Sequence, residues 1–439
     1  MVEPVETPTS LVEPVETPSA STLPLTGIVV LDLTRALAGP YATALLGDLG
    51  ATIIKVESKK GGDTTRAWPP FEGEHSLYFE SVNRNKSSIA IDFYSIEGAA
   101  LLRRLVLDAD VVIENFKPGT MTEMGLDPAT LRAQKPSLII ASVSGFGSTG
   151  PLAQSAGLDQ VAQGMSGLMS ITGEDAAHPM RMGVPIIDMY AGIFTAVGIA
   201  AALVGRERTG GREHGTGRLV ETSLLESAIS VSAFQGQRYL STGEVPVPQG
   251  NNHPVLAPYG VFATGDIPII IAAGNDRHFR QLAELLGEPG LADEPEFATD
   301  RSRSGHRDAL TARLEALLAA RPGLEWVAEL RRIGIPAGPI LNYEQVFQDP
   351  QVRHLDMVKK TVRRDGSALP LLRGPISLDG VAPAITKPPP VLGEDTRAVL
   401  DGLGLTAEQI DGLLAAGIVT EQTSLVEPVE TTPAETAIA

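Results

Sequence analysis

The chain has 439 residues, of which 43% are hydrophobic and 20% charged, and a net charge of −18. This composition is that of an ordinary globular protein with more than one domain, and the acidic excess disfavours nucleic acid as a partner because phosphate binding needs a basic face. The absence of cysteine excludes disulfides, thiolate nucleophiles and cysteine-bound metals, so a reducing cytoplasm is the expected location.

Both ends of the chain carry one repeat. VEPVETP occurs at 2–8 and 12–18, and SLVEPVET returns at 424–431. Proline, glutamate and threonine dominate these segments, so there is too little apolar surface to offset the entropy of ordering. We therefore expect residues 1–23 and 421–439 to be disordered tails. No basic segment followed by an apolar run opens the chain, so no secretion signal is expected.

From residue 25 onward, strand and helix patterns alternate. The predicted strands are 28–33, 52–56, 88–92, 111–114 and 138–142, and the predicted helices are 41–49, 96–107 and 129–134. Strands that alternate with helices of about ten residues indicate a parallel sheet with crossover helices. The first 150 residues are therefore predicted to form a Rossmann-like α/β unit.

The middle of the chain begins with a strand-like apolar run at 184–187, which ends on Asp188. A long apolar helix follows, and its interruption by Asp188 and two glycines favours a buried helix over a membrane span. Beyond this helix, a helical stretch from 223, a strand at 269–273 and helices near 278–286 and 307–320 predict a second, smaller domain.

Three common kinds of site do not fit. The turn after the first strand reads LTRALAGPYA, with Gly39 as its single useful glycine, rather than the GxGxxG of dinucleotide-binding proteins. No serine stands in the GxSxG of hydrolases. The seven histidines show no metal-binding spacing, so no metal site is expected.

Basic residues cluster at the predicted strand ends. The segment 55–66, KVESKKGGDTTR, supplies Lys55, Lys59, Lys60 and Arg66, and the segments NRNK (83–86) and ENFKPG (114–119) stand at two further strand ends. Ligands of open α/β sheets gather at the carboxyl ends of the strands. These segments are therefore predicted to form a phosphate-binding rim.

Asp188 stands at the start of the long apolar helix. Aspartate is a favoured helix N-cap, which satisfies unpaired N–H groups. A helix N-terminus also stabilises an ionised carboxylate, which would keep Asp188 charged and available as a nucleophile. The residues alone leave both interpretations open.

The ordered motifs of the chain resemble those of the family III CoA-transferases, the CaiB/BaiF family, over about residues 24–419. The matching segments are GIVVLDLTRALAGPYATALLGDLGATIIKVE, NRNKSSIAID, ADVVIENFKPG, SVSGFGSTGP, PIIDMYAG, GNDRHF, IPAGPI, DPQV and PVLGEDTRAVLDGLG. The resemblance implies a large Rossmann-like domain built from N- and C-terminal segments (24–222 and 336–420) and a smaller inserted domain (223–335). It also implies an interlocked homodimer with active sites at the domain interface.

The resemblance further implies a chemistry for Asp188. Its carboxylate would attack an acyl-CoA thioester, giving a mixed anhydride and then an aspartyl-CoA thioester, from which an acceptor acid collects CoA. Asp159, in AGLDQ, matches a second acidic residue of the site, with an electrostatic or positioning role. The loop 249–253 is expected to stabilise oxyanions, although its QGNNHP differs from the glycine run of formyl-CoA transferase.

The implied substrates are an acyl-CoA donor, such as the succinyl-CoA used by relatives, and a small carboxylic acid acceptor; no permanently bound cofactor is implied. A second carboxylate of the acid could pair with Arg181 or Arg238. The positions that match the family's CoA contacts are Arg35, Leu37, Ala38, Asn115, Phe116 and Lys117. Ser58, Tyr94 and Glu123 stand where relatives carry basic residues. Tyr94 thus occupies a CoA-binding position, and Lys59, Lys60 and Lys117 are expected to supply the positive charge.

Two alternative functions remain. The superfamily includes α-methylacyl-CoA racemases, which use a His–Asp pair, but Leu158 stands at the histidine position and cannot carry a proton. The other alternative is a protein that binds CoA thioesters without turnover. The presence of Asp188 favours the transferase over this second alternative.

Overall fold

The computed structural model describes residues 23–421, so the predicted tails lie almost entirely outside the described residues. The described chain divides into two compact units. The larger unit contains residues 23–159, 186–227 and 357–421, and the smaller contains 160–185 and 228–356. These ranges differ from the predicted ones: the chain returns to the larger unit at 357 rather than 336, and residues 160–185 belong to the smaller unit.

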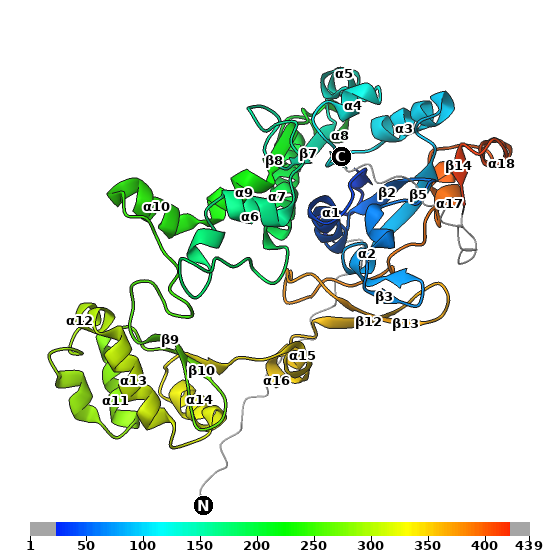
Figure 1. The fold of residues 1–439 in the computed structure, drawn as a ribbon. Coiled ribbons are helices and arrows are strands. Elements are labelled where there is room, and N and C mark those ends of the chain that lie inside the picture. The colour runs from blue at the N-terminus through cyan, green and yellow to red at the C-terminus, as the bar shows by residue number, and fades with distance from the viewer. Residues whose placement is uncertain (1–22, 422–439) are drawn as a thin grey trace, which may run out of the picture. The chain divides into compact units, whose positions relative to one another are not determined.

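A seven-stranded sheet forms the centre of the larger unit, in the order β14-β5-β2-β1-β6-β7-β8 (Figure 1). The strands are β1 (Val29–Asp32), β2 (Thr52–Ser58), β5 (Lys86–Ile91), β6 (Val111–Glu114), β7 (Ile139–Ser144), β8 (Leu219–Ser223) and β14 (Val419–Thr420). All neighbours are parallel except β14, which pairs antiparallel with β5. Counted along the chain, the parallel strands follow the order 3-2-1-4-5-6 of a doubly wound sheet. The predicted parallel α/β sheet is confirmed, and β8 and β14 extend it.

Helices cover both faces of this sheet. One face carries α1 (Ala38–Asp48) and α7 (Ile186–Arg208), whose apolar side chains share a buried cluster with residues of β1, β2, β6 and β7. The opposite face carries α3 (Ile96–Asp108), α5 (Pro128–Gln134), α17 (Thr396–Gly402) and α18 (Ala407–Ala415). The sheet is buried on both sides, which accounts for the continuous apolar runs of its central strands.

Helix α7 packs closely against α1. A Cβ atom at Gly192 would lie 2.6 Å from the carbonyl oxygen of Ala38, so only glycine allows this approach. By length and hydropathy alone α7 could cross a membrane, yet in this fold it lies against α1 and the sheet. The predicted strand-like run at 184–187 is wrong, because Ile186 and Ile187 form the first turn of α7.

Short elements complete the larger unit. They are the hairpin of β3 (Phe71–Glu72) and β4 (His75–Ser76), the hairpin of β12 (Val358–Val362) and β13 (Ala368–Leu372), and the helices α2 (Leu77–Ser81), α4 (Thr120–Glu123) and α8 (Gly211–His214). Helix α9 (Leu224–Val231) runs from the larger into the smaller unit.

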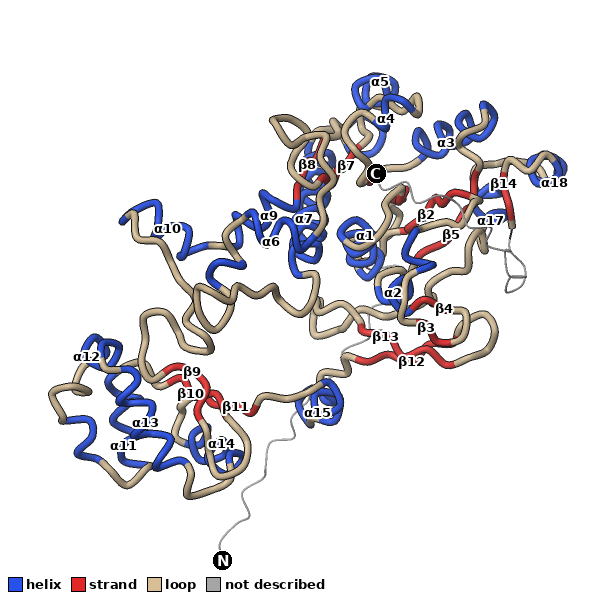
Figure 2. The backbone as a smooth tube through the Cα atoms, in the orientation of Figure 1, coloured by secondary structure: helices blue, strands red, loops and turns tan. Residues whose placement is uncertain are grey.

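The smaller unit has its own sheet and core. The antiparallel strands β9 (Tyr259–Phe262), β10 (Ile269–Ala272) and β11 (Ala337–Pro339) pair in the order β11-β10-β9 (Figure 2). Its helices are α6 (Asp159–Met165, whose first residue belongs to the larger unit), α10 (Ala233–Thr242), α11 (Asp276–Leu285), α12 (Asp300–Gly305), α13 (Arg307–Leu318), α14 (Gly323–Arg332), α15 (Tyr343–Gln348) and α16 (Pro350–His354). Phe279, Leu314 and Trp326 centre a separate hydrophobic core, as expected of an independent unit.

Candidate active site

The strand order of the larger sheet reverses between β1 and β6, which is where ligands of doubly wound folds bind. The turns after these two strands are joined by the side chain of Asn115. Its oxygen accepts from the Arg35 N–H at 2.9 Å, and its amide donates to the Arg35 carbonyl at 2.7 Å. The Arg35 guanidinium lies 5.6 Å from the centre of the Phe116 ring. Three of the predicted CoA contacts are therefore together at the switch point.

A cavity of about 550 Å³ opens beside this cluster. Its lining residues are Leu33, Thr34, Arg35, Val56, Glu57, Ser58, Gly62, Asp63, Phe93, Tyr94, Ser95, Ile96, Ala99, Leu102, Phe116, Thr120, Glu123 and Met124. Tyr94 forms part of this wall and is 82% exposed. The cavity thus offers aromatic and aliphatic surface, with Arg35 as the basic side chain among its lining residues.

The other predicted CoA contacts take different positions. Leu37 and Ala38 are buried at the start of α1, so their side chains serve packing. Lys59 is bound to Asp92 and to the Gly417 carbonyl, both at 2.7 Å. Lys60 is exposed on the turn after β2 and does not line the cavity. The structure therefore brings none of these four residues into the cavity lining.

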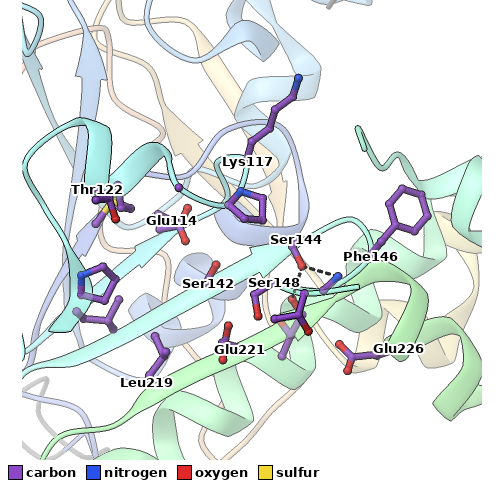
Figure 3. Close-up of a pocket in the computed structure, with 18 residues that line it drawn as sticks. Glu114, Lys117, Thr122, Ser142, Ser144, Phe146, Ser148, Leu219, Glu221 and Glu226 are labelled. Atoms are coloured by element: carbon purple, nitrogen blue, oxygen red, sulfur yellow. Dashed lines mark hydrogen bonds between the residues drawn. The ribbon is translucent and has the colours of Figure 1, made fainter. Parts of the chain in front are cut away.

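Lys117 lines a second cavity, of about 480 Å³, whose walls include residues of β6, β7 and β8. Figure 3 shows its side chain directed away from Glu114, Glu221 and Glu226, which share this cavity. Burial raises the pKa of the Glu114 carboxyl despite hydrogen bonds from Ser142 and from a backbone N–H. Lys117 and Arg35 thus belong to two separate cavities.

The predicted basic rim is largely wrong, because most of its basic side chains are engaged in ion pairs with carboxylates of the fold. Lys55 is fully buried; it pairs with Asp63 at 2.9 Å and donates to the Thr34 carbonyl at 2.8 Å. Lys86 is equally buried and pairs with Asp32 at 3.1 Å. These two lysines therefore stabilise the turn after β1 from the protein interior and do not face a ligand.

Arg66 is also engaged, through two hydrogen bonds of 2.8 and 2.7 Å to Glu57. The carboxylates Asp32, Glu57 and Asp63 that hold the basic residues were not predicted. For Asp32 and Glu57 the sequence signal is a charged residue inside an apolar strand, as in VVLD at 29–32. Asp63 lies in the turn beyond β2 and has no such signal.

Asp188 is the third residue of α7 and lies in its first turn, so the interpretation of Asp188 as the N-cap is wrong. Asp159 takes that role instead. One oxygen of its buried carboxylate accepts from the backbone N–H groups of Ile187, at 2.8 Å, and Asp188, at 3.4 Å. The two predicted catalytic residues therefore meet at the N-terminus of α7.

The electrostatics of this pair differ from the sequence expectation. Burial raises the pKa of Asp188 from 3.8 to about 7, and the negative charge of Asp159 contributes to the rise. Both effects act against the stabilisation of the charged form that is expected from the helix N-terminus. At neutral pH the Asp188 carboxyl is therefore divided between its protonated and ionised forms.

Tyr78, on α2, is within electrostatic range of this pair, which the sequence did not indicate. Partial burial raises the pKa of its phenol, and the negative charges of Asp188 and Asp159 raise it further. Its ring packs edge-on against Trp68, with the ring centres 5.1 Å apart. Helix α2 has five residues, which is too short for a helical pattern of apolar residues to be recognised in the sequence. The only sequence signal for this segment is the pair of aromatic residues in HSLYF.

The remaining predicted groups belong to the smaller unit. In the loop 249–253, the N–H groups of Gly250, Asn252 and His253 donate to carbonyls of that unit. Arg238 is paired with Glu244, and Arg181 donates to the Met182 carbonyl at 2.8 Å. Three N–H groups of the loop that was expected to stabilise an oxyanion are thus already hydrogen-bonded.

The sequence matches known CoA-transferases, and the fold matches a solved structure of the CaiB/BaiF family. A sequence model of CoA-transferase family III matches residues 25–396. The succinate–glutarate CoA-transferase of Agrobacterium fabrum is 41% identical over 384 residues, covering 86% of this chain and 95% of that protein. The acetyl-CoA:oxalate CoA-transferase of Acetobacter aceti is 39% identical, covering 77% of this chain and 86% of that protein.

A solved structure agrees with these sequence matches. The crystal structure of a CaiB/BaiF family protein from Brucella suis is similar with a TM-score of 0.77 at 42% identity, covering 87% of this chain and 99% of that chain. The family model spans most of the chain, and the relatives are covered almost end to end. This chain therefore belongs to CoA-transferase family III.

Proposed function

We propose that this protein transfers CoA from an acyl-CoA donor to a small carboxylic acid through a covalent intermediate on Asp188. The observation that carries the proposal is the meeting of Asp188 and Asp159 at the N-terminus of α7 in a chain of this family. An ionised carboxylate in a partly desolvated site is a competent nucleophile toward a thioester.

Each step exchanges one acyl bond for another. An oxygen of the Asp188 carboxylate attacks the thioester carbonyl, and CoA leaves as the thiolate, giving a mixed anhydride. The thiolate then attacks the Asp188 carbonyl and releases the donor acid, leaving an aspartyl-CoA thioester. The acceptor carboxylate attacks that thioester, which releases the CoA thiolate and gives a second mixed anhydride. The thiolate then attacks the acceptor carbonyl of this anhydride and forms the acceptor acyl-CoA. Asp188 is regenerated as the carboxylate, with no net proton exchange.

Asp159 supports this chemistry without forming a bond to the substrate. Its carboxylate holds the N–H groups of Ile187 and Asp188, which fixes the first turn of α7. Its negative charge also raises the pKa of Asp188, which makes the Asp188 carboxylate more basic. We therefore assign Asp159 a positioning and electrostatic role.

The names of the relatives indicate the substrate class. Succinate, glutarate and oxalate, which appear in those names, are all dicarboxylic acids. We propose succinyl-CoA as the donor and a dicarboxylic acid as the acceptor. The nucleotide part of CoA would occupy the cavity beside Arg35, Asn115 and Phe116, and CoA would be present as a substrate rather than as a permanently bound cofactor.

We also propose that the enzyme is a cytoplasmic homodimer, interlocked as the family resemblance implies. The support is an apolar stripe on α7: Ile193, Val197 and Val204 share one face of the helix, and Val197 and Val204 are 60% and 53% exposed. Apolar surface of this kind marks an interaction site.

Intact mass spectrometry tests the covalent step. After mixing with succinyl-CoA, we expect a mass gain equal to CoA less one water, and the adduct should disappear when glutarate is added. Asp188→Ala and Asp188→Asn should give no adduct. An adduct that persists in both variants would place the covalent bond elsewhere. If no donor gives an adduct, deuterium uptake at the α-carbon of a 2-methylacyl-CoA in heavy water would indicate a racemase instead.

A further inference from the structure

The cavity beside Arg35 presents an open aromatic ring. Tyr94 follows β5 and is 82% exposed, and its ring centre lies 5.0 Å from that of the half-buried Phe93, with the two rings tilted at 46°. Ile96, which is also exposed, continues the same wall. A purine base stacks on an exposed aromatic ring by its flat face, whatever groups its sugar carries. This wall is therefore suited to adenine.

Positive charge is scarce in the same cavity. Among the described residues that line it, Arg35 is the one basic side chain, and its guanidinium is held over the Phe116 ring. Lys59 and Lys60 follow the lining residue Ser58 in the chain but do not line the cavity, and Lys59 is paired with Asp92 at 2.7 Å. One guanidinium suits the diphosphate of CoA. A further phosphate would find no second cation among these described lining residues.

Negative charge is present on the wall. Three carboxylates line the cavity, and two of them are balanced by basic residues of the fold: Glu57 pairs with Arg66 at 2.7 Å, and Asp63 pairs with Lys55 at 2.9 Å. The third, Glu123, is exposed on α4. Its charge would repel a phosphate placed near this wall, because like charges at short range oppose each other.

Besides its diphosphate, CoA carries a phosphate on its ribose 3′ oxygen, with a charge of about −1.5 to −2 at neutral pH. We propose that this cavity binds CoA through adenine and the diphosphate and does not select for the 3′-phosphate, so that the enzyme uses thioesters of 3′-dephospho-CoA about as well as those of CoA. The inference rests on the transferase function and on the placement of the nucleotide proposed above. Selection for a phosphate monoester requires a cation that pairs with it, and the wall offers Glu123 instead.

A comparison of two donors tests the proposal. With glutarate as the acceptor, we expect kcat/KM for succinyl-CoA and for succinyl-3′-dephospho-CoA to agree within about threefold. Calorimetric titration with CoA and with 3′-dephospho-CoA, which involves no turnover, should show the same agreement in Kd. A larger preference for the phosphorylated forms in both measurements would overturn the proposal.

A charge reversal on the wall tests the cause. Glu123→Lys places a cation in the lining, so kcat/KM for succinyl-CoA should rise about tenfold relative to that for the dephospho donor. Glu221→Lys is the matched control, because it makes the same change of charge at an exposed residue of the second cavity. It should leave the ratio within about twofold. An unchanged ratio in Glu123→Lys, or equal changes in both variants, would contradict the role of this wall.

The aromatic ring is tested separately. Tyr94→Ala should raise the KM for both donors about tenfold and leave kcat within about twofold, because stacking of adenine contributes equally to the substrate complex and the transition state. Tyr94→Phe keeps the ring and should keep the wild-type KM. Since Tyr94 is largely exposed, the Tm of both variants should stay near that of the wild type. An unchanged KM in Tyr94→Ala would exclude stacking on this ring.

The donor comparison also separates this inference from the proposed function. If the wild-type protein transfers CoA from neither donor, the proposed function fails. If it transfers CoA from succinyl-CoA and discriminates strongly against the dephospho donor, only the inference about the 3′-phosphate fails.

Discussion

The carboxyl group of Asp188 has to lose its proton before it can act as a nucleophile. Because its pKa is raised to about 7, the reactive fraction changes within the physiological range. We expect kcat/KM for succinyl-CoA to rise about tenfold per pH unit below pH 7 and to level off above it, since kcat/KM reports the free enzyme. A pH profile between 5 and 9 measures this. A flat profile through pH 7 would contradict the assignment.

The neighbouring carboxylate provides the control for that profile. Asp159→Asn removes one negative charge beside Asp188 and should move the midpoint to lower pH. The same variant weakens the cap on α7, so its kcat should also fall. A midpoint that stays in place would mean that burial alone sets the pKa of Asp188.

The same raised pKa predicts an effect on stability. The folded protein holds a proton on Asp188 up to about pH 7, whereas the unfolded chain releases it near the ordinary aspartate pKa of 3.8, so stability is lost as pH rises through this window. Asp188→Asn should therefore stabilise the fold at pH 8 by about 1–2 kcal/mol, after allowing for partial exposure. Thermal unfolding should show a higher Tm for the variant at pH 8 and a smaller gain at pH 5. An equal gain at both pH values would exclude this cause.

At the level of elements, the contact between α7 and α1 depends on one glycine. Gly192→Ala would bring a methyl group within 2.6 Å of a backbone oxygen, which cannot move aside as a flexible side chain can. We expect a loss of about 1–3 kcal/mol in stability, together with reduced activity because Asp188 lies one turn away. Thermal unfolding and the succinyl-CoA assay measure the two effects.

The matched control lies on the same helix. Gly205 has open space around its missing Cβ, so Gly205→Ala should stabilise α7 by up to about 1 kcal/mol through helix propensity. If both substitutions stabilised the protein, the close approach of α7 to α1 would not be a constraint.

A helix or strand could be predicted from the sequence when the residues that determine it lie within the element itself. The strand at 111–114 was placed at its observed bounds, because a buried strand of a parallel sheet is a continuous apolar run. Strand β8 was missed, since LVETS at the sheet edge has exposed and polar positions. The cap of α7 was assigned to the wrong aspartate because Asp159 reaches it from 28 residues away.

The candidate site was harder to predict than the fold. Arg35, Asn115 and Phe116 were placed together through the family resemblance and the strand-end rule. The prediction that Lys55 and Lys86 belong to a phosphate-binding rim is wrong, because both side chains are buried. Sequence position does not tell whether a basic side chain at a strand end points into the core or toward solvent. Tyr78 comes within electrostatic range of the two carboxylates only through tertiary packing.

At the scale of the whole molecule, the exposed stripe on α7 predicts the assembly. Val197→Glu should shift the protein from dimer to monomer in sedimentation, because a charge cannot be buried in an apolar interface without a large penalty. Leu324→Glu, at an exposed position on α14, should leave the mass unchanged. A dimer in both variants would exclude the stripe from the interface, and a monomeric wild type would exclude the dimer.

The division of the larger unit among three chain segments also has a consequence for synthesis on the ribosome. Strand β14 pairs with β5, and Arg363 of the β12–β13 hairpin, at 358–372, pairs with Glu80. The larger unit therefore lacks β14 and this hairpin until late in translation. The smaller unit's core lies between residues 262 and 335 and is complete earlier. Because domains tend to fold as units as they emerge, the inserted unit can fold co-translationally, whereas the surrounding sheet closes only near chain release.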